Sequence, residues 1–241
     1  MLNPPFRLHL PRDRTTSVVF ASPHSGREYG LDFLRRTMLD DMGVRSSEDA
    51  FVDRLFDTAP ELGAPLLAAT VPRAYLDLNR NADELDPALI RGIRPQGHNP
   101  RVASGLGVIP RVVAGGRAIY RGKLELEEAQ QRLNKVWHPY HAALRQLLDQ
   151  SLENFGQAIL VDCHSMPHEA VRSATNKRFL RPHVVLGDRF GPACCTEIMN
   201  SVQAAFERAG LRVSRNTPFA GAYITQHYGR PNRAQHVIQV E

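Results

Sequence analysis

Short apolar runs alternate with amphipathic segments along this chain of 241 residues, and this alternation restricts its fold more than any other feature. The apolar runs predict strands at 17–21, 66–71, 158–162, 182–186, 211–214 and 236–240. Apolar side chains that recur with a period near 3.6 residues predict helices at 48–62, 123–153 and 192–209. Strands that alternate with helices predict an α/β protein whose sheet is mostly parallel or mixed and is covered on both faces.

Two residues limit the predicted helices, and one long region interrupts the alternation. Pro139 should kink the second helix or split it in two, and Gly210 should end the third. Residues 81–122 hold seven glycines, four prolines and six arginines. A region this long without clear secondary structure is usually a functional lid or a mobile excursion. We therefore expect one domain over 1–241 with a loop-rich excursion at about 81–122.

Composition and charge restrict the classes of protein to which this chain can belong. No apolar stretch is long enough to span a bilayer, and the first residues lack the apolar core of an export signal. The three cysteines, Cys163, Cys194 and Cys195, are odd in number and include an adjacent pair, which favours a reducing cytoplasm. The net charge of +5 allows a nucleic-acid surface. However, arginine dominates lysine and forms no dense run, so a small acidic substrate is the better interpretation.

Two histidines come within three residues of the ends of predicted strands. His24 comes after the first strand and His164 after the third, and functional groups in α/β sheets gather at the carboxyl ends of strands. Glu48 and Asp49 precede a helical apolar stripe. Two histidines and one carboxylate suit a metal site with an open position. The plainer alternatives are hydrogen-bonded structural histidines and acids that favour the start of a helix.

Other polar residues fit a binding site less specifically. Asn79 and Arg80 offer an amide beside a guanidinium, a pair that suits a substrate carboxylate, and Arg73 adds a second cation. The alternative is a surface arginine that pairs with a nearby acid. His138 and His141 lie three apart on a predicted helix, where packing is a better interpretation than metal binding. No base is evident for a cysteine nucleophile, and no serine has the context of a serine hydrolase.

Seven collinear motifs carry a family resemblance. They are PHSGREY, SEDAFVDRLFD, VPRAYLDLNR, GLGVIPR, WHPYHAAL, VDCHSMP and PFAGAYITQHYGRP. In this order they resemble the N-formylglutamate amidohydrolase family, from about residue 17 to 241. The DLNR element and the order of ligands are also similar to the wider zinc carboxypeptidase and aspartoacylase group. The resemblance implies a three-layer α/β/α sandwich around a mixed, mostly parallel sheet, with one catalytic Zn²⁺ per chain.

The resemblance also implies which residues hold the metal. The family's ligands fall on His24, Asp49 and His164, with Glu48 as a less favoured neighbour of Asp49. The carboxypeptidase-like group uses a close H-x-x-E pair, whereas here Arg27 is third and Glu28 fourth after the first histidine. Glu28 is therefore a rival for the carboxylate ligand.

Substrate and catalytic residues follow from the same resemblance. Asn79 and Arg80 would hold the substrate carboxylate, helped by Arg73. Glu241, at the end of the Q-x-E strand, would be the general base, although the sequence lacks the segment that usually follows this glutamate. Tyr223 would donate a hydrogen bond to the developing oxyanion.

The expected function is hydrolysis of N-formyl-L-glutamate to glutamate and formate. One alternative is a zinc deacylase of the same fold that acts on another N-acyl amino acid or peptide-like amide. The other is a non-catalytic protein that binds anions or nucleic acid. The acyl group, the metal and the oligomeric state are left open by the sequence.

Overall fold

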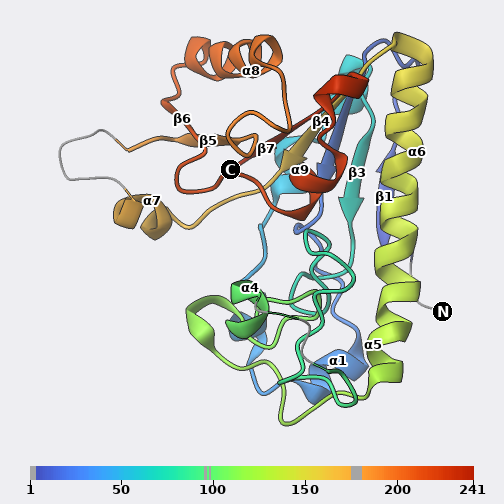
Figure 1. The fold of residues 1–241 in the computed structure, drawn as a ribbon, viewed down its shortest axis with the longest axis vertical. Coiled ribbons are helices and arrows are strands. Elements are labelled where there is room, and N and C mark those ends of the chain that lie inside the picture. The colour runs from blue at the N-terminus through green and yellow to red at the C-terminus, as the bar shows by residue number, and fades with distance from the viewer. Residues whose placement is uncertain (1–3, 95–96, 98, 175–180) are drawn as a thin grey trace. The chain divides into compact units, whose positions relative to one another are not determined.

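A computed structural model describes residues 4–94, 97, 99–174 and 181–241 of the chain, and it shows an α/β fold built on a seven-stranded sheet (Figure 1). The strand order is β1-β3-β2-β4-β7-β5-β6. The strands are β1 Phe6–His9, β2 Val18–Ser22, β3 Leu66–Ala69, β4 Ala158–Cys163, β5 Val184–Gly187, β6 Val213–Arg215 and β7 Gln235–Val240. Six of them overlap the predicted runs, whereas β1, a mostly exposed strand, was not predicted.

The sheet is mixed, which confirms the α/β class with a mixed sheet. β2 pairs with β4, β4 with β7, and β5 with β6, all in parallel, whereas β5 and β7 are antiparallel. The register aligns Ala21 with Asp162 and Asp162 with Gln239. The carboxyl ends of β2, β4 and β7 therefore lie at one edge of the sheet, and each strand delivers the next residues of the chain to that edge.

The helices are shorter and more numerous than the sequence suggested. They are α1 Leu31–Arg36, α2 Asp41–Arg45, α3 Val52–Leu55, α4 Pro100–Ala103, α5 Leu126–Arg132, α6 His138–Phe155, α7 His168–Ala174, α8 Thr196–Arg208 and α9 Tyr223–Tyr228. Short 3₁₀ turns occur at η1 Ala59–Leu62, η2 Ala114–Gly116 and η4 Pro231–Arg233, and a π-helical turn occurs at η3 Leu133–Trp137.

Each predicted helix has a different outcome. The helix predicted at 48–62 is wrong as one element, because Phe51 adopts a left-handed conformation with φ 65° and only α3 and η1 form. The helix predicted at 123–153 forms as α5, η3 and α6, with a π turn that ends two residues before Pro139 rather than a break. The third prediction is confirmed by α8, which ends just before Gly210, whose φ is +80°.

The chain divides into two units by its internal contacts. Unit 1 comprises Met1–Arg7, Pro23–Ala50 and Ala68–Leu144, and unit 2 comprises Leu8–Ser22, Phe51–Leu67 and Arg145–Glu241. In unit 1, Phe33 contacts the rings of Tyr29, Tyr75 and Tyr120 at centroid distances of 5.5 to 6.2 Å. The single domain predicted for 1–241 stays a prediction.

The core of unit 2 lies between its sheet and α8. Met199, Ile198 and Val202 of α8 belong to one apolar cluster with side chains of β4, β5 and β7. Because apolar burial is the main favourable term in folding, this cluster anchors the strands that end at the common edge.

The excursion predicted at 81–122 belongs to unit 1. In its described residues, regular structure is limited to α4, η2 and isolated bridges such as Val112 with Ala118. Residues 95, 96 and 98 lie outside the described part of the chain. In the part that is described, no helix combines the length and apolar character needed to cross a membrane.

Candidate metal centre and substrate-binding segment

His24 lies two residues after the end of β2 and is held by two carboxylates. Its Nε2 lies 2.8 Å from Asp77 Oδ1, and its Nδ1 lies 3.4 Å from Asp49 Oδ2, with all three side chains buried. When the Asp77 carboxylate is ionised, it accepts a hydrogen bond from the Nε2–H group of His24. In this Nε2–H tautomer, the lone pair of Nδ1 points toward Asp49. Metal-binding histidines usually make such a hydrogen bond through their other ring nitrogen.

Asp77 is kept ionised by the groups around it. Burial alone would raise the pKa of Asp77, but Arg73, Arg80 and the contact with His24 together outweigh it and hold the pKa well below its usual range. Arg73 Nε donates to Asp77 Oδ2 at 3.0 Å, and the Asn79 N–H donates to Asp77 Oδ1 at 2.8 Å. Asp77 therefore connects the imidazole of His24 to the Asn79–Arg80 pair.

The three candidate carboxylates differ clearly in their surroundings. Asp49 is buried, and its N–H donates to the His24 carbonyl at 3.1 Å. Glu48 accepts a hydrogen bond from Tyr29 Oη at 2.6 Å. Glu28 forms an ion pair with Arg7 at 2.8 Å. Asp49 is thus the carboxylate whose position suits a ligand beside His24.

His164 follows β4 and repeats the pattern of His24. Its N–H donates to the Val240 carbonyl at 2.8 Å, and its Nε2 lies 3.1 Å from Asp162 Oδ2. Asp162 is fully buried within β4. A buried carboxylate again orients an imidazole and leaves the other ring nitrogen for another partner.

His24, Asp49 and His164 form a buried group that is able to hold a metal ion. Each offers one ligand atom, and these atoms all lie within 4.8 Å of one another. Two imidazoles and one carboxylate are the donor set of many catalytic zinc sites, which keep a fourth position open. The same donors suit several other divalent ions, so the set fits a metal without selecting one.

Asn79 and Arg80 are buried next to this carboxylate network rather than exposed. Arg80 Nε donates to the Leu106 carbonyl at 3.0 Å and Nη1 to the Asn79 carbonyl at 2.8 Å. Its ion pair is with Asp77, at 3.9 Å, rather than with the acids that follow it in sequence. The guanidinium is therefore fixed in orientation, which disfavours the interpretation of a surface arginine.

Glu241 and Tyr223 are connected through a residue that the sequence analysis did not single out. Gln239 Nε2 donates to Glu241 Oε1 at 2.8 Å, and Gln239 Oε1 accepts the Ala222 N–H at 3.2 Å. Ala222 precedes α9, whose first residue, Tyr223, stacks on His227 with ring centroids 5.0 Å apart. Gln239 thus orients the Glu241 side chain and holds the start of α9.

Asp77, Asp162 and Gln239 contact predicted site residues, and the sequence reasoning gave none of them a role. Each lies inside a motif that was noted, but its role depends on which side chain it reaches. Asp77 and His24 are 53 residues apart in sequence. For the contact between Asp162 and His164, the sequence did offer a signal, namely an acid two residues before a histidine at the end of a strand.

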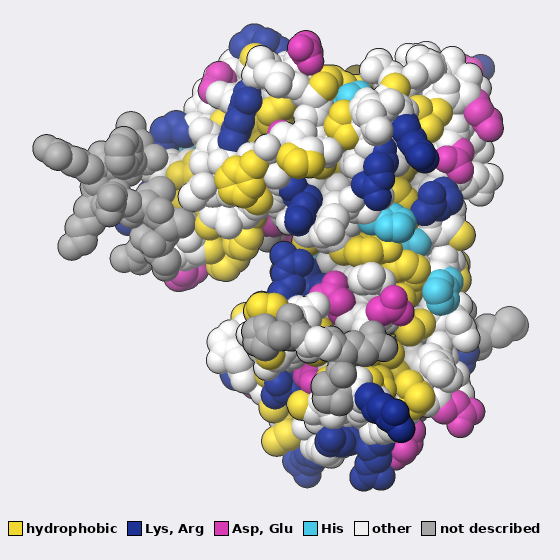
Figure 2. Space-filling model, in the orientation of Figure 1, with side chains coloured by type: hydrophobic (Ala, Val, Ile, Leu, Met, Phe, Trp, Pro, Cys, Tyr) yellow, Lys and Arg dark blue, Asp and Glu magenta, His cyan; other side chains and the backbone are white. Residues whose placement is uncertain are grey.

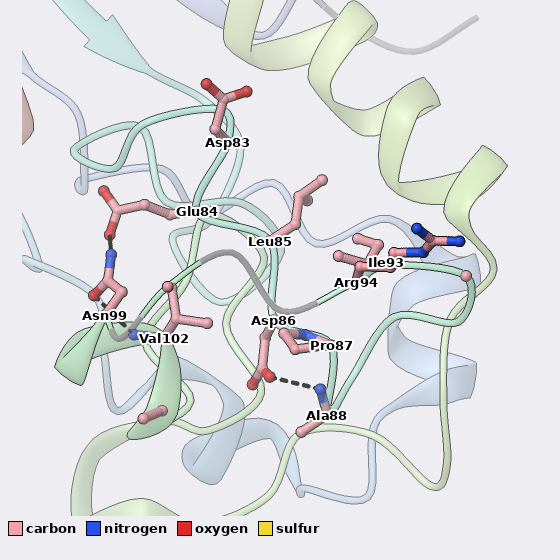
Figure 3. Close-up of a pocket in the computed structure, with 13 residues that line it drawn as sticks. Asp83, Glu84, Leu85, Asp86, Pro87, Ala88, Ile93, Arg94, Asn99 and Val102 are labelled. Carbon is pink, nitrogen blue, oxygen red and sulfur yellow. Dashed lines mark hydrogen bonds between the residues drawn. The ribbon is translucent and has the colours of Figure 1, made fainter.

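A separate cavity of about 670 Å³ lies in unit 1 (Figure 3). Glu84 and Asn99 hydrogen bond across its lining at 3.2 Å, and Asp86 accepts the Ala88 N–H at 2.7 Å. None of the predicted site residues lines this cavity. It therefore does not account for the group of histidines and carboxylate.

The fold and the site define an α/β protein with a buried histidine–carboxylate group able to hold a metal ion. The model of the family "N-formylglutamate amidohydrolase" matches residues 16–241, and the chain belongs to this family. This confirms the resemblance and the expected enzyme class, an amidohydrolase that acts on a linear amide.

Relatives and solved structures agree with this assignment. The chain is 30% identical to N-formylglutamate deformylases of Pseudomonas putida and Pseudomonas aeruginosa, over 93% of its length and 79% of theirs. The crystal structure of N-formylglutamate amidohydrolase from Ralstonia eutropha JMP134 superposes with a TM-score of 0.91 and 35% identity, covering 98% of this chain and 85% of that one. A gene product of Agrobacterium tumefaciens, with a TM-score of 0.68 and 14% identity over 99% and 83% of the two chains, shares the fold.

Proposed function

We propose that this chain hydrolyses N-formyl-L-glutamate to glutamate and formate, with one Zn²⁺ per chain held by His24, Asp49 and His164. The observation that carries the proposal is the buried group of these three side chains, with ligand atoms within 4.8 Å of one another. Family membership over residues 16–241 supports the reaction class. The proposal includes the three-layer α/β/α sandwich of the zinc carboxypeptidase type and a cytoplasmic location.

The proposed roles of the other residues follow from their chemistry. A bound divalent ion supplies a Lewis acid that polarises the formyl carbonyl and acidifies water. Glu241 takes the proton of the attacking water and passes it to the leaving amine. Tyr223 donates a hydrogen bond to the negative charge that develops on the formyl oxygen.

Substrate recognition is assigned to Asn79 and Arg80, with Arg73 as a second cation. A planar guanidinium donates to both oxygens of a carboxylate, and an amide beside it adds a third donor. Arg80 is already oriented by its bonds to the carbonyls of Leu106 and Asn79. Preorganisation of this kind lowers the entropic cost of binding, so we expect selectivity for an acidic substrate.

Turnover of a substrate panel tests this function. Purified protein should hydrolyse N-formyl-L-glutamate faster than its N-acetyl and N-succinyl analogues, and faster than N-formyl-L-leucine. Preference for another acyl group on glutamate would support a deacylase of the same fold instead.

Binding of DNA without amidase activity would support the nucleic-acid interpretation. On the face shown in Figure 2, lysine and arginine side chains occur in several separate groups among acidic and apolar ones. This distribution does not favour a continuous basic surface.

A further inference from the structure

We infer that one helical run positions the substrate-binding segment Tyr75–Arg80 through three side chains, Arg132, Trp137 and His141, which we call the donor face. The inference rests on the proposed role of Asn79 and Arg80 in substrate binding. Each member donates one N–H to a main-chain carbonyl of the segment: Arg132 Nη1 to Tyr75 O at 3.0 Å, Trp137 Nε1 to Arg80 O at 2.9 Å, and His141 Nε2 to Leu78 O at 2.9 Å.

These three bonds matter because the segment lies in turns rather than in a strand. A strand would have its carbonyls satisfied by a neighbouring ladder, whereas buried carbonyls in an irregular segment need other donors. Leu78 and Asn79 are buried, and Arg80 is only 7% exposed. The donor face supplies partners at the start, middle and end of the segment, so it determines where Asn79 and Arg80 lie.

The π turn η3 aligns the donor face. In a regular α-helix, residues five apart such as Arg132 and Trp137 lie roughly 140° apart around the axis. Here the His138 N–H bonds to the Leu133 carbonyl, which is an i→i+5 bond. This wider turn brings residues five apart onto one face. Trp137 and His141 are four apart in the following α-helix, where they are neighbours.

The sequence contains a reason for this π turn. Pro139 has no N–H, and in a regular α-helix its ring would clash with the carbonyl four residues before it, that of Lys135. The π turn covers Leu133–Trp137 and therefore includes Lys135. The wide turn accommodates the proline without ending the helix, and it also sets the spacing of the donor face.

Neighbouring contacts fix the donors themselves. The Arg132 guanidinium lies 4.1 Å from the centroid of the Tyr75 ring and pairs with Glu128 at 2.6 Å. The Trp137 and His141 rings lie 4.0 Å apart. The three residues act through the segment rather than through contacts assigned to substrate or metal, so they are positioning residues.

The variant Trp137→Phe tests the inference with the smallest change. It removes one N–H and keeps a ring against His141. Loss of one hydrogen bond should raise KM for N-formyl-L-glutamate about three- to tenfold, while kcat and metal content stay within about twofold. The dissociation constant of L-glutamate, measured by calorimetry, should rise by a similar factor. An unchanged KM and dissociation constant would overturn the inference.

Two variants of His141 separate positioning from packing. His141→Gln keeps an N–H donor, whereas His141→Leu keeps only bulk. We expect KM to remain near that of the wild type in the first and to rise in the second, at matched melting temperatures. Equal KM values in the two variants would contradict a role for the hydrogen bond.

Deletion of Asn134 tests the π turn itself. Asn134 is exposed, and its removal leaves one residue too few for the wide turn, so Arg132 rotates by roughly 100° away from the other two donors. KM should then rise more than in Trp137→Phe. The control Asn134→Ala keeps the length and should behave as the wild type. Equal kinetics for deletion and control would count against the register argument.

Amide hydrogen exchange tests the positioning role without relying on turnover of any substrate. In Trp137→Phe, the amides of residues 75–80 should exchange faster, while those of β4 keep their protection. Exchange unchanged at 75–80 would refute the inference whatever the substrate is. If the wild type fails to hydrolyse N-formyl-L-glutamate, the proposed function fails, and the exchange result still decides the positioning role.

Discussion

The parallel strands β2, β4 and β7 and the segment Tyr75–Arg80 place functional residues in different ways. The strands are held by main-chain ladders, and their aligned ends deliver His24, His164 and Glu241. The segment has only scattered main-chain bonds, such as that of the Asp77 N–H to the Val108 carbonyl, and three side chains donate to its carbonyls. A ladder tolerates most single side-chain changes, whereas an irregular segment depends on particular donors. Substitutions in the two regions should therefore affect different steps.

The largest expected effect comes from the strand ends. His164→Ala removes one proposed ligand, so it should abolish stoichiometric metal binding. Activity should fall by more than the roughly 100-fold that loss of a ligand's outer hydrogen-bond partner can cause. Metal content and turnover of the purified variant measure this. The control is His138→Ala, an exposed histidine of α6. Metal and activity retained in His164→Ala would contradict the ligand assignment.

The second largest effect is expected at Glu241, directly after β7, where a loss of turnover should occur without a loss of metal. Glu241→Gln keeps the shape of the side chain and removes its basicity, so kcat should fall about 10²- to 10⁴-fold, the usual contribution of a general base. Metal content should stay the same. The exposed Glu207→Gln on α8 is the matched control. A variant that loses metal together with activity would place Glu241 in the structure of the site rather than in proton transfer.

A smaller effect is expected in the segment. Arg80→Ala removes a fixed guanidinium, and loss of charged hydrogen bonds should raise KM for N-formyl-L-glutamate about 10- to 100-fold. The effect on kcat should be much smaller. Steady-state kinetics give the two values, and Arg208→Ala, an exposed arginine of α8, serves as the control. If kcat alone falls, Arg80 contributes to the transition state and the contrast between the two regions is wrong.

The smallest effect concerns the support of the donor face. Burial raises the pKa of Glu128, but hydrogen bonds from Arg36 and Arg132 outweigh it and lower that pKa. A carboxyl whose folded pKa is depressed stabilises the fold above its unfolded pKa, and this contribution is lost as pH falls through the folded pKa. Glu128→Gln should therefore reduce the free energy of unfolding at pH 7 by about 1 kcal/mol or less, because the site is partly exposed.

Chemical denaturation at several pH values measures this effect. The difference between Glu128→Gln and the wild type should shrink as the pH drops below about 4, near the ordinary pKa of a glutamate. A difference that is constant with pH would show that packing rather than charge is responsible.

Much of the fold was predictable because apolar runs report buried strands directly. The ends of the predicted strands indicated where His24 and His164 lie, and the structure groups these two residues with Asp49. Their role as ligands stays a proposal. The strand β1 was missed because it is short and mostly exposed, so it contains no apolar run. The helix predicted at 48–62 was wrong because Phe51 takes a left-handed conformation that periodicity does not report.

The contacts of the segment could not be predicted in the same way. The hydrogen bond of His141 to Leu78 spans 63 residues, and that of Trp137 to Arg80 spans 57. No local pattern specifies such pairs. The sequence did indicate that packing is a better role than metal binding for His141, and its buried hydrogen bond to a carbonyl agrees with this. Pro139 indicated a disturbance of the helix but not the π turn that resulted.

The most direct test of the central claim is anomalous scattering at the zinc edge from crystals of the purified protein. The account predicts one peak per chain, within about 2.0–2.2 Å of ring nitrogens of His24 and His164 and of a carboxylate oxygen of Asp49. A peak ligated by other residues, or crystals grown with excess zinc that show no peak at these three side chains, would contradict it.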